Sequence, residues 1–220
     1  MAGHAPSATR KSRPRDRALT RAAILEAAER IFAEAGDAGA RTDAIAAAAG
    51  VNKALLYYYF RSKGELYRAV LEEHLKDFRR QAFAVLDSGG PARAVLLRYV
   101  DMHFDFISAR PHYPRLFQRL VMAGGKTLER LAGELFHPLS RKVVGLIDRG
   151  VRAGEFRPVD SVHAAISLVA LTVFYFSAAP VVRVVTGRDP YARGNLARRK
   201  REVLNFVRYG LFRNPEAEVQ

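Results

Sequence analysis

Hydrophobic residues recur along most of the chain at the three- and four-residue spacing that is typical of an amphipathic α-helix. The first run predicts a helix that Gly36 ends, and the break at Gly89-Gly90-Pro91 separates the later runs from the earlier ones. The expected helices are 18–35, 43–49, 53–60, 63–88, 92–109, 115–123, 127–153, 161–179 and 191–212. Because strand signals are scarce, the pattern predicts an all-α fold of about nine helices.

Several residues in this pattern have a predicted role at a helix end or a helix break. We expect Thr42, Ser62 and Asp160 to cap the helices that follow them. Pro138 lies inside the run 127–153, where a proline removes a backbone donor, so we expect a kink or a break there.

Residues 42–60 have the spacing of a helix-turn-helix motif, in which a three-helix unit presents its last helix to DNA. Two short helices that cross steeply need a small residue at their contact, which Ala46 supplies. The turn needs a left-handed residue, which Gly50 supplies. The apolar residues expected to form the shared seam are Ile45, Ala49, Val51 and Leu56. The second helix then faces the major groove.

The outer face of that second helix carries groups that suit DNA, namely Lys53, Ala54, Leu55, Tyr57, Tyr58 and Tyr59. A tyrosine hydroxyl can bond a phosphate, and its ring can contact a thymine methyl group. Thr42 and Lys63 each stand at a helix N-terminus, which favours phosphate. Three successive tyrosines span about 200° of a helix surface, so they cannot all pack into one core. At least one tyrosine is therefore exposed beside lysines, which favours DNA binding over plain packing.

The composition adds a charge argument. Lys and Arg number 36 against 22 Asp and Glu, which gives +14 and points to a polyanion, either nucleic acid or an anionic membrane surface. Residues 1–15 combine basic residues with no periodicity, which predicts a disordered arm. No apolar stretch follows them as a signal peptide would require. The absence of cysteine excludes a disulfide framework and a cysteine nucleophile.

Residues 161–182 contain no charged side chain, and their number alone would permit a membrane span. Serine, threonine, histidine and proline dilute the apolar character of the segment, so we favour a helix that is buried in a core or between subunits. Together with 191–212 it is the expected dimer interface, and no membrane partner is predicted. The basic run Arg198-Arg199-Lys200-Arg201 is either a second anion site or a solvated face.

The later helices also carry candidates for the wall of a ligand cavity. These residues are Met102, His103, Phe106, Phe117, Phe136, Phe174 and Tyr175, and the wider aromatic group to which they belong adds Phe104, Tyr113 and Phe176. Aromatic residues at helical spacing also occur as plain core packing, and both interpretations remain open. No two histidines stand four residues apart on one helix, so we predict no metal site. No catalytic residue and no cofactor are assigned.

The stretch from Arg17 to Val70 resembles the N-terminal domain of the TetR family of bacterial transcriptional regulators. The resemblance rests on Ile24-Leu25-Glu26-Ala27-Ala28, Phe32, Gly36, Thr42, Ile45-Ala46, Ala49-Gly50-Val51, Lys53, Leu56-Tyr57-Tyr58, Phe60, Ser62-Lys63 and Leu66. The remaining helices are similar to the variable ligand-binding and dimerisation domain of that family.

The resemblance implies roles for single positions. Those that tend to hold the DNA backbone in the family correspond to Thr42, Lys53, Tyr57, Tyr59 and Lys63, and those that tend to meet bases correspond to Asp43, Lys53, Ala54, Leu55 and Tyr57. The chain departs from the family at Leu55, where a hydroxyl residue is common, and at Tyr59, where histidine is common. An apolar Leu55 favours contact with a thymine methyl group, so the operator sequence cannot be transferred.

The resemblance also implies an organisation and a function. The expected parts are a basic arm (1–15), a DNA-binding domain (16–68), a ligand-binding and dimerisation domain (69–213) and a flexible tail (214–220). The expected protein is a cytoplasmic homodimer that represses transcription at a double-stranded operator until an unidentified small-molecule effector releases it. The alternatives are an activator, a basic membrane-associated helical protein that uses 161–182, or an enzyme.

Overall fold

The computed structural model describes residues 14–216, which contain eleven α-helices, one π-helix and an isolated β-bridge. The all-α prediction is confirmed. The helices form two compact units, one that ends at Val70 and one that begins at Leu71, within the same helix. The expected arm lies outside the described residues except for Pro14 and Arg15, and residues 217–220 of the expected tail lie outside them as well.

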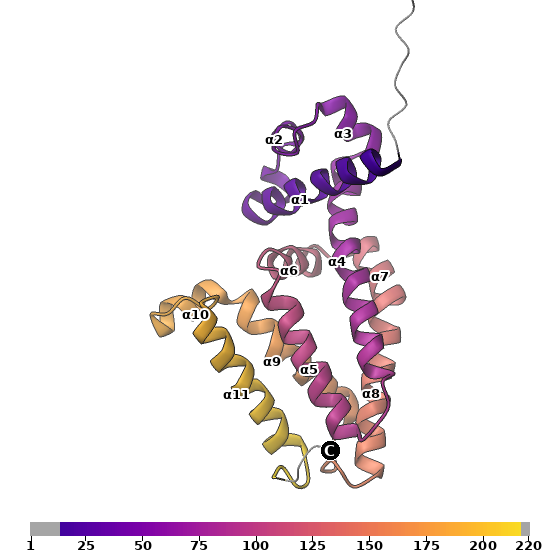
Figure 1. Cartoon of the computed structure of the whole chain (residues 1–220), viewed down its shortest axis with the longest axis vertical. Helices are drawn as coiled ribbons and strands as arrows, with labels where there is room; N and C mark the ends of the chain where they lie inside the picture. Colours follow the sequence, from indigo (N-terminus) through magenta and orange to yellow (C-terminus); the bar gives the residue numbers. More distant parts are fainter. Residues whose placement is uncertain (1–13, 217–220) are drawn as a thin grey trace, which may run out of the picture. The chain divides into compact units, whose positions relative to one another are not determined.

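The first unit contains α1 (Pro14–Gly39), α2 (Thr42–Ala48), α3 (Lys53–Tyr59) and the first turns of α4 (Lys63–Leu86) (Figure 1). α1 begins before the predicted residue 18, because a proline is well tolerated in the first turn of a helix. Gly36 interrupts its helical backbone with a φ of 74°, as the sequence predicted. The centre of the unit is apolar and fully buried, with Ile24, Ala28, Phe32, Ile45, Leu56 and Leu66 as its members.

Local signals set the ends of α2, α3 and α4. Gly50 adopts a φ of 67°, so the left-handed turn between α2 and α3 is confirmed. The Ser62 side chain accepts a hydrogen bond from the backbone N–H of Glu65 (3.1 Å), so it caps α4 as expected. Thr42 is the first residue of α2 and not its cap, which corrects the prediction. Its hydroxyl lies 3.3 Å from the Tyr57 hydroxyl instead of bonding the backbone of its own helix.

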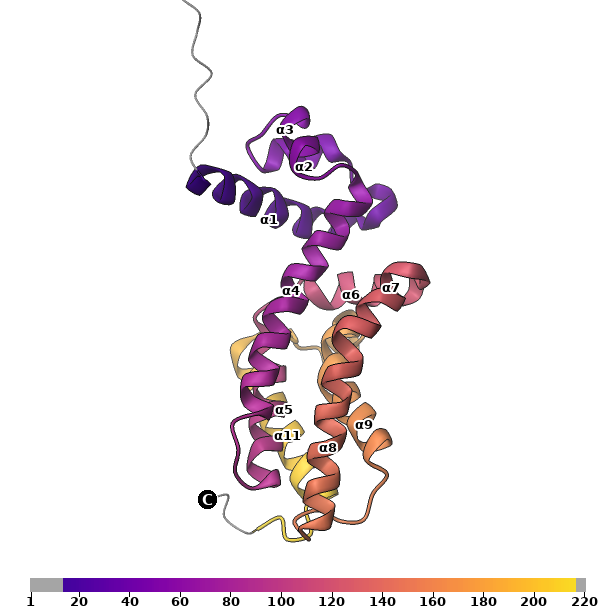
Figure 2. The same ribbon diagram turned by 90° about the vertical axis from the view of Figure 1, so that its right-hand side faces the viewer.

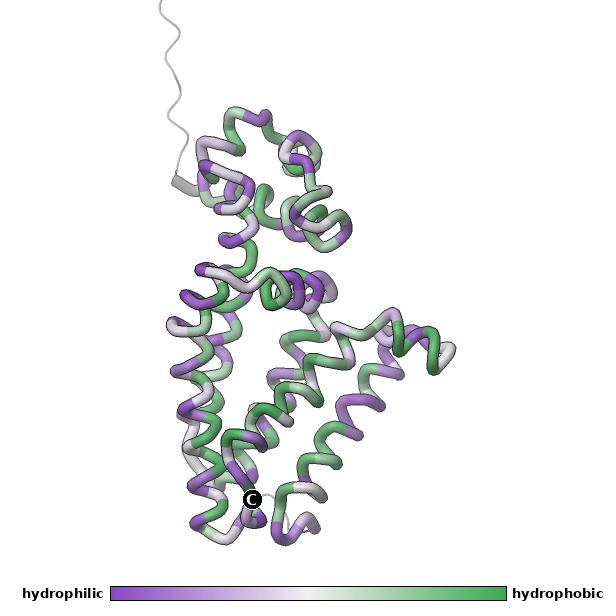
Figure 3. The backbone as a smooth tube through the Cα atoms, turned by 180° about the vertical axis from the view of Figure 1, so that it is seen from behind, coloured by the Kyte–Doolittle hydropathy of each residue, from purple (hydrophilic) through white to green (hydrophobic). Residues whose placement is uncertain are grey.

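The second unit is built around α5 (Ala92–Ser108), which is the most thoroughly buried helix and packs against α8, α9 and α11. The remaining helices are α6 (Tyr113–Ala123), α7 (Gly125–Leu131), α8 (His137–Arg152), α9 (Ser161–Ser177), α10 (Ala179–Thr186) and α11 (Arg193–Leu211). Figure 2 shows α5, α8, α9 and α11 running side by side along this unit. In Figure 3, hydrophobic and hydrophilic positions follow one another along the helices of this unit, although α9 itself contains no charged residue.

The segment 127–153 is interrupted, as Pro138 predicted. A π-helix occupies Ala132–Phe136 between α7 and α8, and the backbone N–H of His137 bonds the carbonyl of Ala132, five residues back. Proline follows immediately and has no N–H to donate, so it cannot continue the α-helical ladder through this point. The expected helix 127–153 is therefore two α-helices, α7 and α8, and α10 is a further helix that was not expected. For these two reasons the described part of the chain has eleven α-helices where about nine were predicted.

The end of the second unit opposite α10 is closed by contacts between two segments far apart in sequence. Phe156 and Phe212 form the β-bridge, and their rings stack with centroids 5.3 Å apart. Both rings are almost fully buried. The Glu155 carboxylate accepts hydrogen bonds from the backbone N–H groups of Ala92 (3.0 Å) and Arg93 (2.9 Å). A side chain from the loop after α8 therefore caps the first turn of α5.

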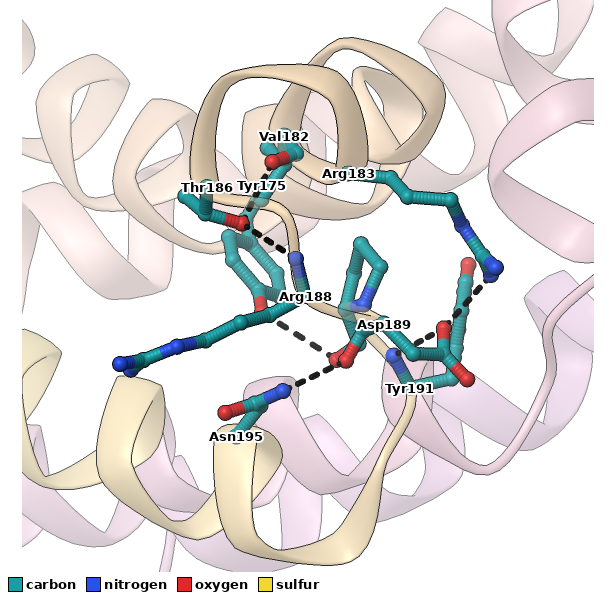
Figure 4. Close-up of polar contacts among 9 residues, drawn as sticks. Tyr175, Val182, Arg183, Thr186, Arg188, Asp189, Tyr191 and Asn195 are labelled. Atoms are coloured by element: carbon teal, nitrogen blue, oxygen red, sulfur yellow. Dashed lines mark hydrogen bonds and ion pairs between the residues drawn. The ribbon is translucent and has the colours of Figure 1, made fainter.

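Polar bonds fix the connection between α10 and α11 (Figure 4). The Asp189 carboxylate pairs with Arg183 at 2.7 Å and accepts from the Tyr191 backbone N–H at 3.2 Å. The Tyr175 hydroxyl donates to the Pro190 carbonyl at 3.2 Å, and the Asn195 amide donates to the Asp189 carbonyl at 2.8 Å. These bonds attach the start of α11 to α9 and α10.

Within residues 14–216, no single helix is both long and apolar enough to cross a membrane. α9 and α10 meet that criterion only as a pair, and the chain bends by 73° between them.

Candidate nucleic-acid interface and cavity

α3 exposes the face that the sequence assigned to it. Leu56 is fully buried and fixes the orientation of the helix, while Lys53, Ala54 and Leu55 lie at the surface. Tyr58 is 66% exposed and Tyr57 is 38% exposed, whereas Tyr59 is only partly exposed and packs edge-on against Tyr58.

Asn52 caps α3, because its side chain accepts from the Leu55 backbone N–H at 2.8 Å. Asn52 was not among the expected caps, although asparagine before a helical run is a cap signal.

The start of α2 lies against α3 through two polar pairs. The Lys53 ammonium is 2.9 Å from the Asp43 carboxylate, and this hydrogen bond raises the pKa of Lys53. Thr42 and Tyr57 form the second pair through their hydroxyls. The structure therefore brings Thr42, Asp43, Lys53 and Tyr57 together on one exposed surface that combines a cation with hydroxyl and aromatic groups. Such a surface can bond phosphates and reach base edges.

Lys63 occupies a different place from the one its position suggested. Its ammonium donates to the Asp37 carbonyl (2.5 Å) and to the Ala40 carbonyl (3.4 Å), and it lies 3.6 Å from the Asp37 carboxylate. Asp37 and Ala40 stand at the end of α1, where carbonyl groups lack partners inside the helix. Lys63 therefore stabilises the end of α1, a contact between distant segments that local sequence does not reveal.

The second unit contains an apolar cavity of about 90 Å³. Its walls come from α4, α5, α6, the π-helix, α8 and α9, and the lining residues are Phe78, Tyr99, His103, Ile107, Tyr113, Pro114, Phe117, Phe136, Leu139, Val169 and Val173. His103, Phe117 and Phe136 were predicted cavity residues. Tyr113 was named in the same aromatic group, and it also lines the cavity. Tyr99 was not named, because helical spacing shows which face is buried but not which buried rings border a void.

The other predicted cavity residues lie elsewhere. Phe106 is buried just behind the wall, where its ring packs against Phe78 (5.0 Å) and Tyr113 (5.7 Å). Phe174 is 70% exposed, Tyr175 bonds the α10–α11 connection, and Met102 is half-buried outside the lining.

The cavity has few polar groups, and all of them are uncharged. Nδ1 of His103 lies 3.1 Å from the Thr172 hydroxyl, and both side chains are buried. Burial lowers the pKa of His103 to about 4, so its ring is neutral at physiological pH. Burial also raises the pKa of Tyr99 and Tyr113, so both hydroxyls keep their protons.

The basic run Arg198-Arg199-Lys200-Arg201 does not face solvent as a whole. Arg199 donates to the Leu171 carbonyl at 3.0 Å, and its guanidinium lies over the Tyr175 ring. Lys200 pairs with Asp101 (2.7 Å) and Asp105 (2.8 Å). These two cations attach α11 to α9 and to α5.

Known protein families match the two compact units of the structure separately. Residues 24–70 match the bacterial regulatory proteins of the tetR family, and residues 91–207 match the tetracyclin repressor-like C-terminal domain. The HTH-type transcriptional regulator RutR of Escherichia coli (strain K12) is 35% identical over 166 residues, which cover 75% of this chain and 77% of RutR. The HTH-type transcriptional repressor NicS of Pseudomonas putida is 31% identical over 166 residues, covering 72% and 76%.

A solved structure extends the agreement to three dimensions. AibR, in complex with isovaleryl coenzyme A and operator DNA, has a TM-score of 0.69 and 17% identity, covering 85% of this chain and 97% of that chain. At that identity the likeness concerns the fold. Both units thus match one family in sequence, and the helix-turn-helix exposes α3 above a buried Leu56. The chain belongs to the TetR family of bacterial transcriptional regulators.

Proposed function

We propose that the chain is a ligand-responsive repressor that binds a palindromic operator as a homodimer and is released by a small-molecule effector. The observation that carries the proposal is the exposed surface of α3, where Lys53, Tyr57 and Tyr58 stand over a buried Leu56. NicS is named as a repressor, and the AibR structure is titled as a complex with a coenzyme A ester and operator DNA. We extend both properties to this chain as part of the proposal.

One copy of α3 is too short to read a long DNA site, so a dimer is physically required for high specificity. Two copies would read half-sites about 34–36 Å apart on one face of the duplex. The proposed contacts are Thr42, Asp43, Lys53, Ala54, Leu55, Tyr57, Tyr58 and Tyr59. Lys63 contributes mainly by holding the end of α1, and its ammonium stays close enough to the surface to meet a phosphate as well.

Exposed apolar side chains on the second unit support the homodimer. On α9, Val162, Ile166 and Val169 recur at three- and four-residue spacing, so they share one face, and each is at least 44% exposed. On α11, Phe206 and Tyr209 are more than half exposed. A second copy of the chain would bury this surface in a helical bundle.

α4 provides a route by which an effector acts on DNA binding. Phe78, in the second half of this helix, lines the cavity, and Lys63, at its start, holds the end of α1. An effector that binds one position of α4 better than another shifts the population of dimers away from the one that fits two successive major grooves. The protein is proposed to act in the cytoplasm, where its DNA target lies.

The test is a titration of the full-length protein with the intergenic DNA beside its own gene, followed by fluorescence anisotropy at several salt concentrations. Binding should weaken steeply with salt. For each tenfold rise in salt concentration, the logarithm of the binding constant should fall by about 0.9 per phosphate contact. Tyr57→Ala should weaken binding on every sequence, whereas Met122→Ala, which removes an exposed side chain from α6 outside the proposed dimer surface, should not. Equal affinity of the Tyr57→Ala variant and the wild type would reject the proposed interface.

A further inference from the structure

We propose that the cavity of the second unit selects a small, uncharged effector that donates an N–H or O–H hydrogen bond to Nε2 of His103. This inference rests on the proposed function for its biological meaning, but the chemistry of the cavity can be tested on the protein alone. Three features of the cavity carry it, namely its neutrality, the tautomer of His103 and two tyrosine hydroxyls without partners.

Neutrality follows from the lining. Every residue that borders the cavity is uncharged at physiological pH, because the one titratable imidazole has a pKa of about 4. A charged ligand would lose its hydration and would find no opposite charge in the wall. The cavity therefore favours neutral molecules over carboxylates and ammonium ions.

The tautomer of His103 follows from the bonds of Thr172. The Thr172 hydroxyl has one proton, and its oxygen lies 3.0 Å from the Val169 carbonyl and 3.2 Å from the Leu168 carbonyl. Both carbonyls can only accept, so the hydroxyl proton is given to the helix backbone. Nδ1 of His103, 3.1 Å from the same oxygen, must then be the donor in that contact.

Nε2 of this neutral ring consequently keeps a lone pair. Nothing among residues 14–216 is bonded to it, since the hydrogen bond of the ring is made through Nδ1. The ring is held by Phe78 (5.0 Å) and Tyr99 (5.9 Å), so it is oriented before any ligand arrives. An oriented acceptor in an apolar cavity selects a ligand that donates.

The hydroxyls of Tyr99 and Tyr113 add further polar positions. Both side chains line the cavity and are more than nine-tenths buried. Neither hydroxyl has a hydrogen-bond partner in the described part of the chain. Because both side chains border the cavity, a ligand with a second polar atom can pair with one of these hydroxyls.

The volume limits the size of the effector. A cavity of about 150 Å³ is known to admit benzene, which sets the scale for the 90 Å³ found here. The cavity is therefore smaller than one that admits benzene, and even a single small ring requires small movements of the aromatic wall. One small ring with a polar edge satisfies all of these limits.

Three probes of similar size test whether the cavity prefers a neutral donor to a neutral molecule that cannot donate and to a charged molecule. Each probe is titrated into the wild-type protein and its binding is measured by calorimetry. Phenol is neutral and donates, anisole is neutral and cannot donate, and benzoate is charged. Phenol should bind about tenfold more tightly than either of the others. Equal or tighter binding of anisole or benzoate would overturn the proposal.

Two variants and one spectroscopic measurement locate the effect. Tyr113→Phe should weaken phenol severalfold, and Tyr175→Phe, the same change outside the cavity, should leave it unchanged. Thr172→Val removes the acceptor for Nδ1 and frees the ring to change tautomer, so the preference for phenol over anisole should shrink. Nitrogen NMR of the wild-type His103 ring should show the proton on Nδ1, and a proton on Nε2 would refute the mechanism.

The DNA titration of the preceding section is kept separate. If the protein binds operator DNA but binds phenol and anisole equally, the proposed ligand class fails while the proposed function stands. If the protein prefers phenol and binds no DNA, the proposed function fails while the chemistry of the cavity stands.

Discussion

At the scale of single residues, the Phe156 ring packs directly against α8 at Gly150. A Cβ atom placed on Gly150 would lie 2.3 Å from the Phe156 ring, which is fully buried and cannot retreat into solvent. Glycine is therefore required at position 150 by the space around it, since its backbone is ordinary α-helix. Gly145, on the same helix, has no atom within 4 Å of such a Cβ.

This contrast gives a matched pair of substitutions. Gly150→Ala should lower the free energy of unfolding by about 1–3 kcal/mol, because the ring must move within a closed core. Gly145→Ala should leave stability unchanged or raise it by up to about 1 kcal/mol, because alanine is the better helix former. Urea unfolding of both variants measures the difference, and equal effects would contradict the packing described for Phe156.

His103 gives the second unit a dependence on pH. Its pKa is about 4 in the folded protein and near 6.5 in the unfolded chain, so only the unfolded chain takes up a proton as the pH falls through 6.5. The contribution of His103 is therefore complete above pH 6.5 and is lost between pH 6.5 and 4, at up to about 1.4 kcal/mol per pH unit. Denaturant titrations at several pH values measure this loss. His163→Gln, which replaces an exposed histidine, is the control and should lose stability with falling pH as the wild type does. In His103→Gln the free energy of unfolding should depend less steeply on pH.

Which residues could be assigned from the sequence depended on how local their contacts are. Gly50, Ser62 and Asp160 were predicted correctly, because a turn or a cap is decided within three or four residues. Lys63 was expected to contact DNA, and its bonds to the end of α1, which reach across 23 and 26 residues, were not foreseen. Such contacts depend on the packed fold and leave no local signal.

At the scale of helices, periodicity predicted the positions of most elements, and the differences have local causes. Pro138 was recognised as a break, but a π-helix before it could not be distinguished from a simple kink by sequence. α10 was missed because the expected helix ended at 179 and residues 180–190 were left as a connection, whereas the chain bends after α9 and stays helical to Thr186. The uncharged composition of residues 161–182 also explains why a membrane span had to be considered.

The capping of α5 by Glu155 is an element-scale prediction. Glu155→Ala removes two charge-assisted bonds to backbone N–H groups at the start of the central helix. We expect the free energy of unfolding to fall by about 1–2 kcal/mol. Glu129→Ala removes an exposed carboxylate from α7 and serves as the control, with no comparable loss in the same urea titration. A loss as large for the control would show that charge alone, and not the cap, is responsible.

At the scale of the whole molecule, the positive charge acquires a more specific meaning. The excess of +14 first suggested one general attraction to polyanions. In the second unit, Arg110, Lys142, Arg183 and Lys200 are each paired with an aspartate, so part of the basic composition holds helices together. The case for DNA binding accordingly depends on the surface of α2 and α3 and not on the total charge.

The proposed homodimer leads to a prediction about the molar mass of the protein in solution. Ile166→Glu places a charge on the exposed apolar face of α9 and should convert the dimer into a monomer in light scattering. Met122→Glu introduces the same charge at an apolar residue of α6 that is 82% exposed and should leave the dimer intact. The monomer should also bind operator DNA more weakly, because it reads one half-site. A dimer that survives Ile166→Glu would place the interface elsewhere.

The bridge between Phe156 and Phe212 also has a consequence for the newly made protein. Arg157 bonds the Phe212 carbonyl across 55 residues, so this closure waits until the later segment has left the ribosome. At about 5–20 residues per second, the delay lasts roughly 3–11 s. Throughout that interval Phe156 lacks its stacking partner, and α5 and α9 lack the helix that covers them. The nascent second unit therefore presents apolar surface to chaperones for seconds before it can close.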